Sequence, residues 1–172
     1  MKVLIVVDMQ NDFIDGALGT PDAVAIVPNV KKKIAEYVEN GNEVVFTQDT
    51  HFSDYLETHE GKLLPVSHCI FNTHGFEIPE DINIKSCDHI YKCAFGWNWA
   101  LTKEDDYTDW HDIEIIGLCT DICVISNALI LRSIYREADI TVDASCCAGT
   151  TPERHKAALE VMKSCQINII GE

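Results

Sequence analysis

Short apolar runs alternate along the chain with longer stretches of helical periodicity. The apolar runs predict strands at residues 3–7, 43–47, 88–92, 113–117, 140–142 and 167–170. Helices are predicted at residues 28–40, 121–137 and 152–164. Apolar strands that alternate with helices are typical of a parallel sheet covered on both faces, so the pattern predicts an α/β fold.

The length of the chain, 172 residues, suits one domain with a full hydrophobic core. No repeat, low-complexity segment or linker interrupts the pattern, so we expect a single domain over residues 1–172. Residues 51–85 are the least regular part and are rich in His, Gly and Pro. Long loops in compact α/β domains usually carry function.

The formal net charge of −15 argues against nucleic acid or an anionic membrane as a partner, because phosphate binding needs clustered Lys and Arg. The basic run Lys31, Lys32 and Lys33 falls on a predicted amphipathic helix, where we interpret it as a solvated face. No apolar run approaches the roughly 18–20 residues that a membrane span needs.

Eight cysteines are present, an even number that would allow a disulfide framework. Such frameworks belong to small secreted domains, and a core of this size needs none. The apolar run at the N-terminus is also too short for a signal peptide. We therefore expect a reduced, cytoplasmic protein.

Cys123 lies in the most informative stretch, residues 115–124. An apolar strand stops there at Gly117, turns, and leads into a predicted helix with the Cys123 thiol in its first turn. A helix N-terminus offers unpaired backbone N–H groups and a positive partial charge. Both favour the thiolate, so we predict a lowered thiol pKa and a nucleophile at the carboxyl edge of the sheet.

Two charged residues occupy comparable places in the pattern. Asp8 closes the first predicted strand and Lys92 ends the third, so parallel strands would bring both to the edge that carries Cys123. A carboxylate there can take the thiol proton, and an ammonium group stabilises both anions. Taken singly, Asp8 could cap a loop, Lys92 could be a solvated strand end and Cys123 a core residue. The three together favour a catalytic site.

A second group of polar residues follows the second predicted strand. Asp49 and His51 project to the same side if the chain is extended there, and His68 can return through the long loop. Glu60 and His59 are both available as a further ligand. Carboxylate and imidazole donors together suit Zn²⁺, Mn²⁺ or Fe²⁺. Histidines of a polar loop are otherwise ordinary surface residues, and the spacing alone leaves both interpretations open.

The sequence resembles the cysteine hydrolases of the isochorismatase-like superfamily over essentially its whole length. The resemblance is carried by Val-Asp-Met-Gln-Asn-Asp-Phe at residues 7–13, by Lys92, and by Gly-Leu-Cys-Thr-Asp-Ile-Cys-Val at residues 117–124. Isochorismatases proper lack the nucleophilic cysteine, so Cys123 indicates the amidase side of the superfamily. The resemblance implies a three-layer, doubly wound fold with a Rossmann-like parallel sheet of about six strands in the order 3-2-1-4-5-6.

The resemblance also implies a role for each catalytic candidate. Asp8 would deprotonate Cys123, whose thiolate would attack an amide carbonyl while Lys92 stabilises the charges. Backbone N–H groups of Cys119 and Cys123 would hold the oxyanion, beside a non-proline cis peptide bond at Leu118–Cys119. Asp8 would then protonate the departing ammonia and activate the water that releases the acid from the thioester.

The same resemblance assigns the polar group to a metal. In nicotinamidases, an Asp-x-His after the second strand, a later acidic or His residue and a His before the third strand bind a metal that coordinates the pyridine nitrogen. Asp49, His51 and His68 match directly; Glu60 fits the subgroup that uses glutamate, with His59 as the competitor. Amidases for carbamoyl or maleamate-type substrates lack this cluster. We therefore expect a divalent metal, zinc ahead of manganese and iron, and the nicotinamidase branch.

Aromatic residues supply the expected substrate pocket. By resemblance, Phe13 would pack against the substrate ring, although core packing would also account for it. Trp97 and Trp99 follow Lys92 closely and could wall the same pocket. Residues 93–99 read Cys-Ala-Phe-Gly-Trp-Asn-Trp, where many nicotinamidases carry a Ser-Ala-Phe-like segment, so we expect this pocket to differ.

These inferences predict a metal-dependent nicotinamidase that converts nicotinamide to nicotinate and ammonia, with pyrazinamide as an adventitious substrate. One alternative is a cysteine amidase for another small amide, in which the histidines are structural. Another is a catalytically silent binding protein that keeps the fold. Members of the family often form dimers or tetramers, so a homo-oligomer is the default expectation.

Overall fold

A parallel six-stranded sheet forms the centre of the computed structural model, which describes residues 1–103 and 110–172. Its strand order is β3-β2-β1-β4-β5-β6. The strands are β1 (Lys2–Val7), β2 (Glu43–Asp49), β3 (Asp88–Lys92), β4 (Asp112–Leu118), β5 (Asp139–Ala148) and β6 (Asn168–Ile170). The α/β fold and the strand order expected from the sequence are both confirmed.

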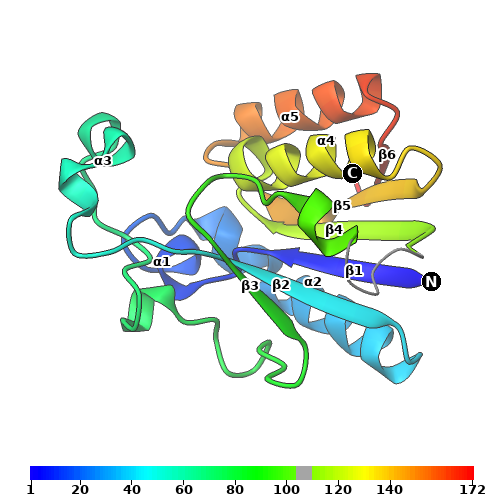
Figure 1. Cartoon of the computed structure of the whole chain (residues 1–172), viewed down its shortest axis with the longest axis horizontal. Coiled ribbons are helices and arrows are strands. Elements are labelled where there is room, and N and C mark those ends of the chain that lie inside the picture. The colour runs from blue at the N-terminus through cyan, green and yellow to red at the C-terminus, as the bar shows by residue number, and fades with distance from the viewer. Residues whose placement is uncertain (104–109) are drawn as a thin grey trace.

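Helices cover both faces of the sheet (Figure 1). Helix α2 (Pro21–Glu39) lies on one face, and helices α4 (Ile125–Ile134) and α5 (Pro152–Ser164) lie on the other. The shorter helical elements are α1 (Asn11–Ile14), η1 (Tyr55–Glu57), α3 (His59–Leu63), η2 (His74–Phe76), η3 (Trp99–Lys103) and η5 (Thr120–Val124). A helix that could cross a membrane is absent from the described residues, since every one there is too short or too polar.

Strand β1 shows why the apolar runs predicted the sheet. Its residues alternate between two core layers: Val3 and Ile5 pack in the layer below α4 and α5, whereas Leu4 and Val6 pack in the layer below α2. A strand buried on both faces needs a continuous apolar run rather than an alternating one. Since the strands are parallel, their carboxyl ends lie at one edge, and α1 and α3 follow β1 and β2 there (Figure 1).

Helix α2 begins well before the predicted start at Pro28. Its first turn contains Pro21, and the side chain of Thr20 accepts a hydrogen bond from the backbone N–H of Ala23 at 3.0 Å. Pro28 lies inside the helix instead. The prediction was wrong because a proline marks a helix start only where no earlier cap exists. Thr20-Pro21 is the same signal that correctly placed the start of α5.

Two other predicted elements need correction. Strand β5 extends to Ala148, well beyond the predicted residues 140–142. The predicted helix at 121–137 is a π-helical turn, η5, followed by α4, which ends at Ile134. In η5 the backbone N–H of Val124 donates to the carbonyl of Cys119 at 3.1 Å, so the first turn is wider than an α-helical one. Residues 51–85, expected as an irregular loop, contain η1, α3 and η2.

Candidate active site

Asp8, Lys92 and Cys123, here called the triad, meet at the carboxyl edge of the sheet. The ammonium nitrogen of Lys92 lies 2.6 Å from Asp8 Oδ2 and 3.6 Å from Cys123 Sγ. All three side chains are buried, with exposed fractions of 0% for Asp8, 1% for Lys92 and 4% for Cys123. Parallel topology thus brings together three residues that are far apart in the sequence, as the strand pattern predicted.

The ends of the strands hold the charged members of the triad in place. Asp8 adopts a left-handed backbone conformation with φ of 47°, and its Oδ1 accepts a hydrogen bond from Thr47 Oγ1 at 2.7 Å. Lys92 also donates to the carbonyl of Ala94 at 3.1 Å. Left-handed non-glycine residues cluster at functional sites because the surrounding structure must hold them there. Asp8 therefore leaves β1 in a direction that an ordinary strand end would not take.

The triad sets where the proton of Cys123 resides. Burial raises the pKa of the thiol well above its ordinary value, and the Asp8 carboxylate raises it further, whereas Lys92 lowers it. Burial likewise raises the pKa of Asp8, against the opposing charge of Lys92. The lowered thiol pKa predicted from the helix start is therefore wrong, because the partial charge of a helix terminus is weaker than complete burial. The resting site holds a neutral thiol beside a carboxyl group that is more basic than usual.

The turn after β4 carries the groups expected to hold an oxyanion. The peptide bond Leu118–Cys119 is cis, as the resemblance implied. The carbonyl of Cys119 accepts hydrogen bonds from Ile122 N–H at 3.0 Å and from Val124 N–H at 3.1 Å, which closes the turn in front of Cys123. The backbone N–H groups of Cys119 and Cys123 stay the predicted oxyanion donors.

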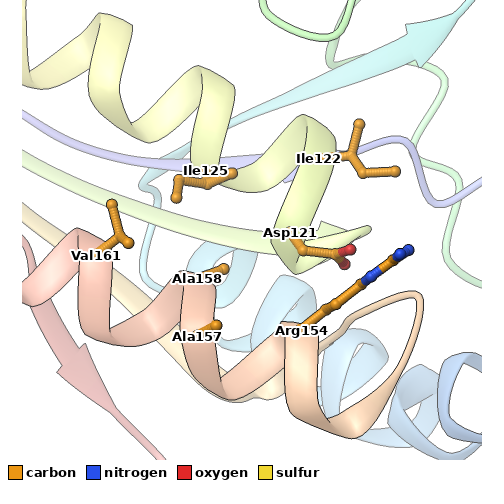
Figure 2. Close-up of a pocket in the computed structure, with 7 residues that line it drawn as sticks. All are labelled: Asp121, Ile122, Ile125, Arg154, Ala157, Ala158 and Val161. Atoms are coloured by element: carbon orange, nitrogen blue, oxygen red, sulfur yellow. The ribbon is translucent and has the colours of Figure 1, made fainter.

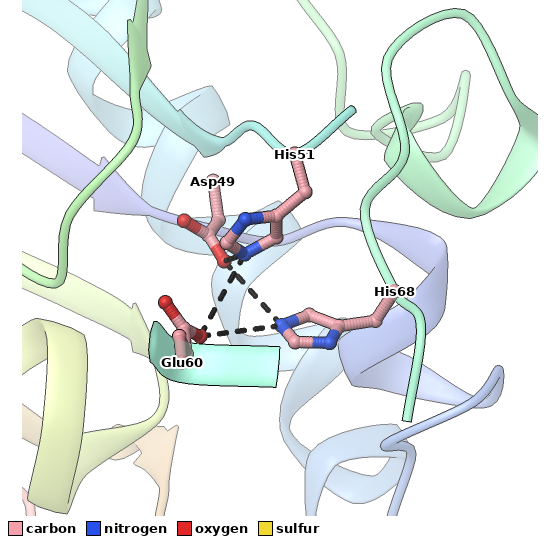
Figure 3. Close-up of side chains that lie close together, drawn as sticks. All are labelled: Asp49, His51, Glu60 and His68. Carbon is pink, nitrogen blue, oxygen red and sulfur yellow. Dashed lines mark hydrogen bonds and ion pairs between the residues drawn. The ribbon is translucent and has the colours of Figure 1, made fainter. Parts of the chain in front are cut away.

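Asp49, His51, Glu60 and His68, here called the donor cluster, point toward one another (Figure 3). One ligand atom from each lies within 4.8 Å of all the others. His59 is exposed and lies outside this cluster, so the structure places Glu60 rather than His59 beside the other donors. Lys92 connects the two groups, since its ammonium nitrogen lies 3.6 Å from Asp49 Oδ1.

The donor cluster fits a divalent cation. His51 Nε2 lies 3.0 Å from Asp49 Oδ2 and 3.7 Å from Glu60 Oε1, and His68 Nε2 lies 3.6 Å and 3.9 Å from the same two oxygens. Ligand atoms around tetrahedral zinc are separated by about 3.4 Å, given metal–ligand bonds of about 2.1 Å. Two imidazoles and two carboxylates are donors that zinc, manganese and iron accept.

Backbone contacts prepare His68 for this role. Its Nδ1 faces the carbonyl of Val66 at 2.8 Å, and because a carbonyl only accepts, Nδ1 must carry the proton. The lone pair of Nε2 then points toward the donor cluster, which is the usual arrangement of a metal-binding histidine. Burial lowers the pKa of His68, but hydrogen bonding and charge from Asp49 outweigh this and raise it.

A cavity of about 50 Å³ lies between the triad and the donor cluster. A ligand that fits this cavity must be small. The cavity is lined by Phe13, Leu18, Asp49, Glu60, Leu64, His68, Phe95, Cys119, Ile122 and Cys123. Phe13 therefore has the position predicted for it, with its ring centroid 5.5 Å from that of His68.

Trp97 and Trp99 were predicted to wall the pocket, but neither is among the described residues that line it. Both pack in the core layer below α4 and α5 instead. Phe95 lines the cavity in their place, and it is 48% exposed. An aromatic-rich segment shows that rings are available but not which ring turns inward, because that depends on contacts remote in sequence.

Asn127 explains why Trp97 and Trp99 pack in the core. The sequence patterns did not indicate a role for it. It is fully buried on α4, and its Oδ1 accepts hydrogen bonds from the backbone N–H of Trp97 and from Trp99 Nε1, both at 2.9 Å. Its Nδ2 donates to the carbonyl of Cys123 at 2.8 Å. A polar residue four positions after the cysteine, on the buried face of the helix, was the available signal. Asn127 joins the segment after β3 to the turn that carries Cys123.

A larger groove of about 430 Å³ lies outside this site, between the η5–α4 segment and α5 (Figure 2). It is lined by Asp121, Ile122, Ile125, Arg154, Ala157, Ala158 and Val161. Ile122 borders both this groove and the small cavity, but no member of the triad or the donor cluster lines the groove. No cysteine or histidine lines the groove, whereas Cys123 lines the smaller cavity, so the smaller cavity is the candidate active site.

Comparisons with known proteins agree with the fold. The sequence matches the isochorismatase domain family over residues 2–171, so the chain belongs to the isochorismatase family. The nicotinamidase of Saccharomyces cerevisiae is 26% identical over 217 residues that span 100% of both proteins.

Solved structures extend the comparison to the whole architecture. The pyrazinamidase of Pyrococcus horikoshii, crystallised in complex with zinc, has 30% sequence identity and a TM-score of 0.85 over 99% of each chain. The nicotinamidase/pyrazinamidase PncA of Bacillus subtilis has 27% identity and a TM-score of 0.83, covering 99% of this chain and 100% of that one. The likeness thus covers the elements that carry the triad and the donor cluster.

Proposed function

We propose that this protein is a metal-dependent nicotinamidase, which hydrolyses nicotinamide to nicotinate and ammonia. The observation that carries the proposal is that Cys123 lines one small cavity together with three members of the donor cluster, Asp49, Glu60 and His68. Its proposed base, Asp8, lies behind it and pairs with Lys92, which contacts the Cys123 sulfur. The similarity to proteins named nicotinamidase and pyrazinamidase supports the same substrate class. Pyrazinamide, whose ring presents a nitrogen at the same place, is an expected second substrate.

The first half of the reaction forms a thioester. The carboxylate of Asp8 takes the proton of Cys123, and the sulfur attacks the carboxamide carbon while Lys92 stabilises the anions around it. The carbonyl oxygen becomes an oxyanion that accepts hydrogen bonds from the backbone N–H groups of Cys119 and Cys123. Asp8 then returns the proton to the amide nitrogen, the C–N bond breaks, and ammonia leaves.

The second half regenerates the thiol. Asp8, again a carboxylate, accepts a proton from water, and the hydroxide attacks the thioester carbon. The C–S bond breaks, nicotinate forms, and the proton on Asp8 passes to the sulfur of Cys123. The raised pKa of Asp8 suits both directions of transfer, because a general base works best when its pKa approaches the working pH.

The donor cluster is proposed to hold the cation, with zinc ahead of manganese and iron. When bound, the metal supplies a Lewis acid for an aromatic ring nitrogen, and so orients the carboxamide toward Cys123. Phe13 lies beside His68 and can pack against the ring of a bound substrate. The substrate is thus selected by a ring nitrogen at one end of the cavity and a carboxamide at the other.

The proposal extends to the setting in which the protein works. All eight cysteines lie in the described residues and are free, which supports a reducing, cytoplasmic environment. The single sheet and a family match over residues 2–171 support one catalytic domain. The expected partner is a small amide with a single aromatic ring.

Ammonia release from nicotinamide by the purified protein tests the proposal. We expect release that disappears after chelation, returns on addition of zinc, and is absent in the Cys123→Ala variant. A protein that contains zinc but releases no ammonia would contradict nicotinamide as the substrate and favour another small amide. His51→Ala serves as the ligand control: if hydrolysis survives with unchanged KM, the metal does not orient the substrate.

A further inference from the structure

We infer that two residues of the opening motif, Gln10 and Asp12, hold the donor cluster in the geometry that a metal needs. The inference rests on the proposed function, because it concerns the same site. Phe13 of the motif lines the cavity and Asp8 pairs with Lys92 of the triad, whereas Gln10 and Asp12 do neither. They act through other residues and are therefore positioning residues.

Gln10 fixes the backbone of Asp49. Its Oε1 accepts a hydrogen bond from Asp49 N–H at 2.7 Å, and its Nε2 donates to the carbonyl of Asp49 at 2.8 Å. The same Nε2 donates to the carbonyl of Phe76 at 2.9 Å. Gln10 is fully buried, so its amide pairs with Asp49 as a neighbouring strand would, in a place that water does not reach. The direction of the Asp49 carboxylate follows from this pairing.

Asp12 fixes the segment that carries His68. Its Oδ2 accepts a hydrogen bond from the backbone N–H of Cys69 at 2.8 Å, and its Oδ1 accepts one from Ala17 N–H at 3.2 Å. Gly75 packs against the Asp12 carboxylate so closely that a Cβ there would overlap it. The Asp12 carboxylate is therefore closely packed against the backbone and is not free in solvent.

The hydrogen bond from Cys69 to Asp12 also affects a third member of the donor cluster, His51. The carbonyl of Cys69 accepts a hydrogen bond from His51 N–H at 3.0 Å, and the carbonyl of His51 accepts one from Phe71 N–H at 2.8 Å. These bonds make a parallel bridge between His51 and Ile70. Asp12 thus positions the backbone of His51 as well as that of His68. With Gln10 on Asp49, three of the four donors are held by one short segment after β1.

The test measures zinc affinity of the full chain by competition with a chromophoric chelator. Gln10→Met keeps the size of the side chain and removes its three hydrogen bonds. Gln48→Met is the matched control, because Gln48 is also buried and donates to the same Phe76 carbonyl, at 3.1 Å, but makes no hydrogen bond to Asp49. Residues that orient metal ligands typically change metal affinity about 10- to 100-fold when mutated. We expect such a loss for Gln10→Met and a change of less than about 2-fold for Gln48→Met.

Asp12→Asn provides an independent variant that keeps the shape of the side chain. Its amide group can serve only one of the two N–H donors, so zinc affinity is expected to fall about 10-fold. Asp15→Asn makes the same charge change on an exposed residue nearby and controls for the lost negative charge. If Gln10→Met does not fold, as its melting temperature without metal would show, the comparison of Asp12→Asn with Asp15→Asn decides.

A second readout separates positioning from general damage. Neither side chain hydrogen-bonds to the triad among the described residues, so alkylation of Cys123 in the metal-free variants is expected to proceed as in the unmodified protein. Unmodified protein that binds no zinc would contradict the proposed function. If the wild-type protein binds zinc, and Gln10→Met and Asp12→Asn bind it as tightly as their control variants do, this inference alone would be overturned.

Discussion

At Cys123 two effects act on one proton in opposite directions. The start of η5 favours the thiolate, while burial and the Asp8 carboxylate favour the neutral thiol. Burial is the larger effect because a full negative charge in a closed site loses nearly all its hydration. In the proposed mechanism the thiolate therefore forms as the reaction proceeds, by proton transfer to Asp8, and is not present beforehand.

Asp8→Asn is predicted to change two reactions of Cys123 in opposite directions. Loss of the general base should slow nicotinamide hydrolysis about 10²- to 10⁴-fold. The same change removes the anion that raises the thiol pKa and leaves Lys92 beside the sulfur, so iodoacetamide should alkylate Cys123 faster at pH 8. Steady-state kinetics measures the first effect, and mass spectrometry of the Cys123 peptide measures the second.

Cys123→Ala provides the baseline for both assays, because the other cysteines can also react. If Asp8→Asn slowed alkylation together with hydrolysis, Asp8 would not be the group that holds the thiol neutral. Unchanged hydrolysis would exclude Asp8 as the base.

Site residues with distinctive chemistry could be predicted from the sequence. Asp8, Lys92 and Cys123 each follow an apolar run, and parallel topology alone brings such positions together. The roles of Gln10 and Asn127 could not be predicted, because their partners are backbone groups remote in sequence and any polar residue could make such bonds. Predicting them requires knowing which segments touch.

At the scale of elements, the close approach of β4 to β1 sets the position of the turn before Cys123. Gly117 has φ of 120°, and a Cβ there would overlap the carbonyl oxygen of Val7. The pairing of β4 with β5 also shifts register between Ile115 and Gly117. Such irregularities re-aim a strand and occur often beside active sites.

Gly117→Ala is predicted to lower the free energy of unfolding by more than about 3 kcal/mol, because it adds a backbone clash to an unfavourable φ. Gly41→Ala is the matched control: Gly41 also has a positive φ, 68°, but a Cβ there would meet nothing within 4 Å. Its cost should be only about 1 kcal/mol. Urea unfolding measures both, and equal losses would mean that the contact with Val7 is unimportant.

Strand β3 and helix α5 have the predicted bounds. A Thr-Pro start marks α5, whereas most residues of β3 are exposed or half-buried. The start of α2 was missed when Pro28 was taken as a boundary. The wide turn of η5 has no pattern of its own, since a single turn is too short to show a period in the sequence.

At the scale of the whole molecule, the excess of negative charge is partly neutralised inside the fold. Lys33 of α2 was interpreted as part of a solvated face, and this was wrong. Its ammonium group lies 2.6 Å from Glu114 of β4 and 3.0 Å from Asp143 of β5, and Tyr37 also donates to Glu114, at 2.6 Å. The ion pairs attach α2 to two strands, whereas Lys31 and Lys32 are exposed as expected.

This network makes stability depend on pH. Burial raises the pKa of Asp143, but hydrogen bonds from Ser145 and Lys33 outweigh this and hold the pKa below its ordinary value of 3.8. A carboxyl group with a lowered pKa in the folded state stabilises the protein above the unfolded value and loses that contribution as pH falls through the folded value. The contribution of Lys33 should therefore be complete at neutral pH and decline below about pH 4.

Lys33→Met is predicted to lower the free energy of unfolding by about 3 kcal/mol at pH 7, because it removes the nearest cation from two nearly buried carboxylates, Glu114 and Asp143. Glu114 keeps only the more distant Lys2, at 3.9 Å. Lys32→Met is the control: Lys32 pairs with Glu36 at 3.8 Å on the exposed face, where such a pair contributes less than about 1 kcal/mol. Urea unfolding between pH 7 and pH 3.5 should show the effect of Lys33→Met shrinking as Asp143 becomes protonated. A loss that stays constant across this range would mean that Lys33 acts through the packing of its methylene groups, because packing does not titrate.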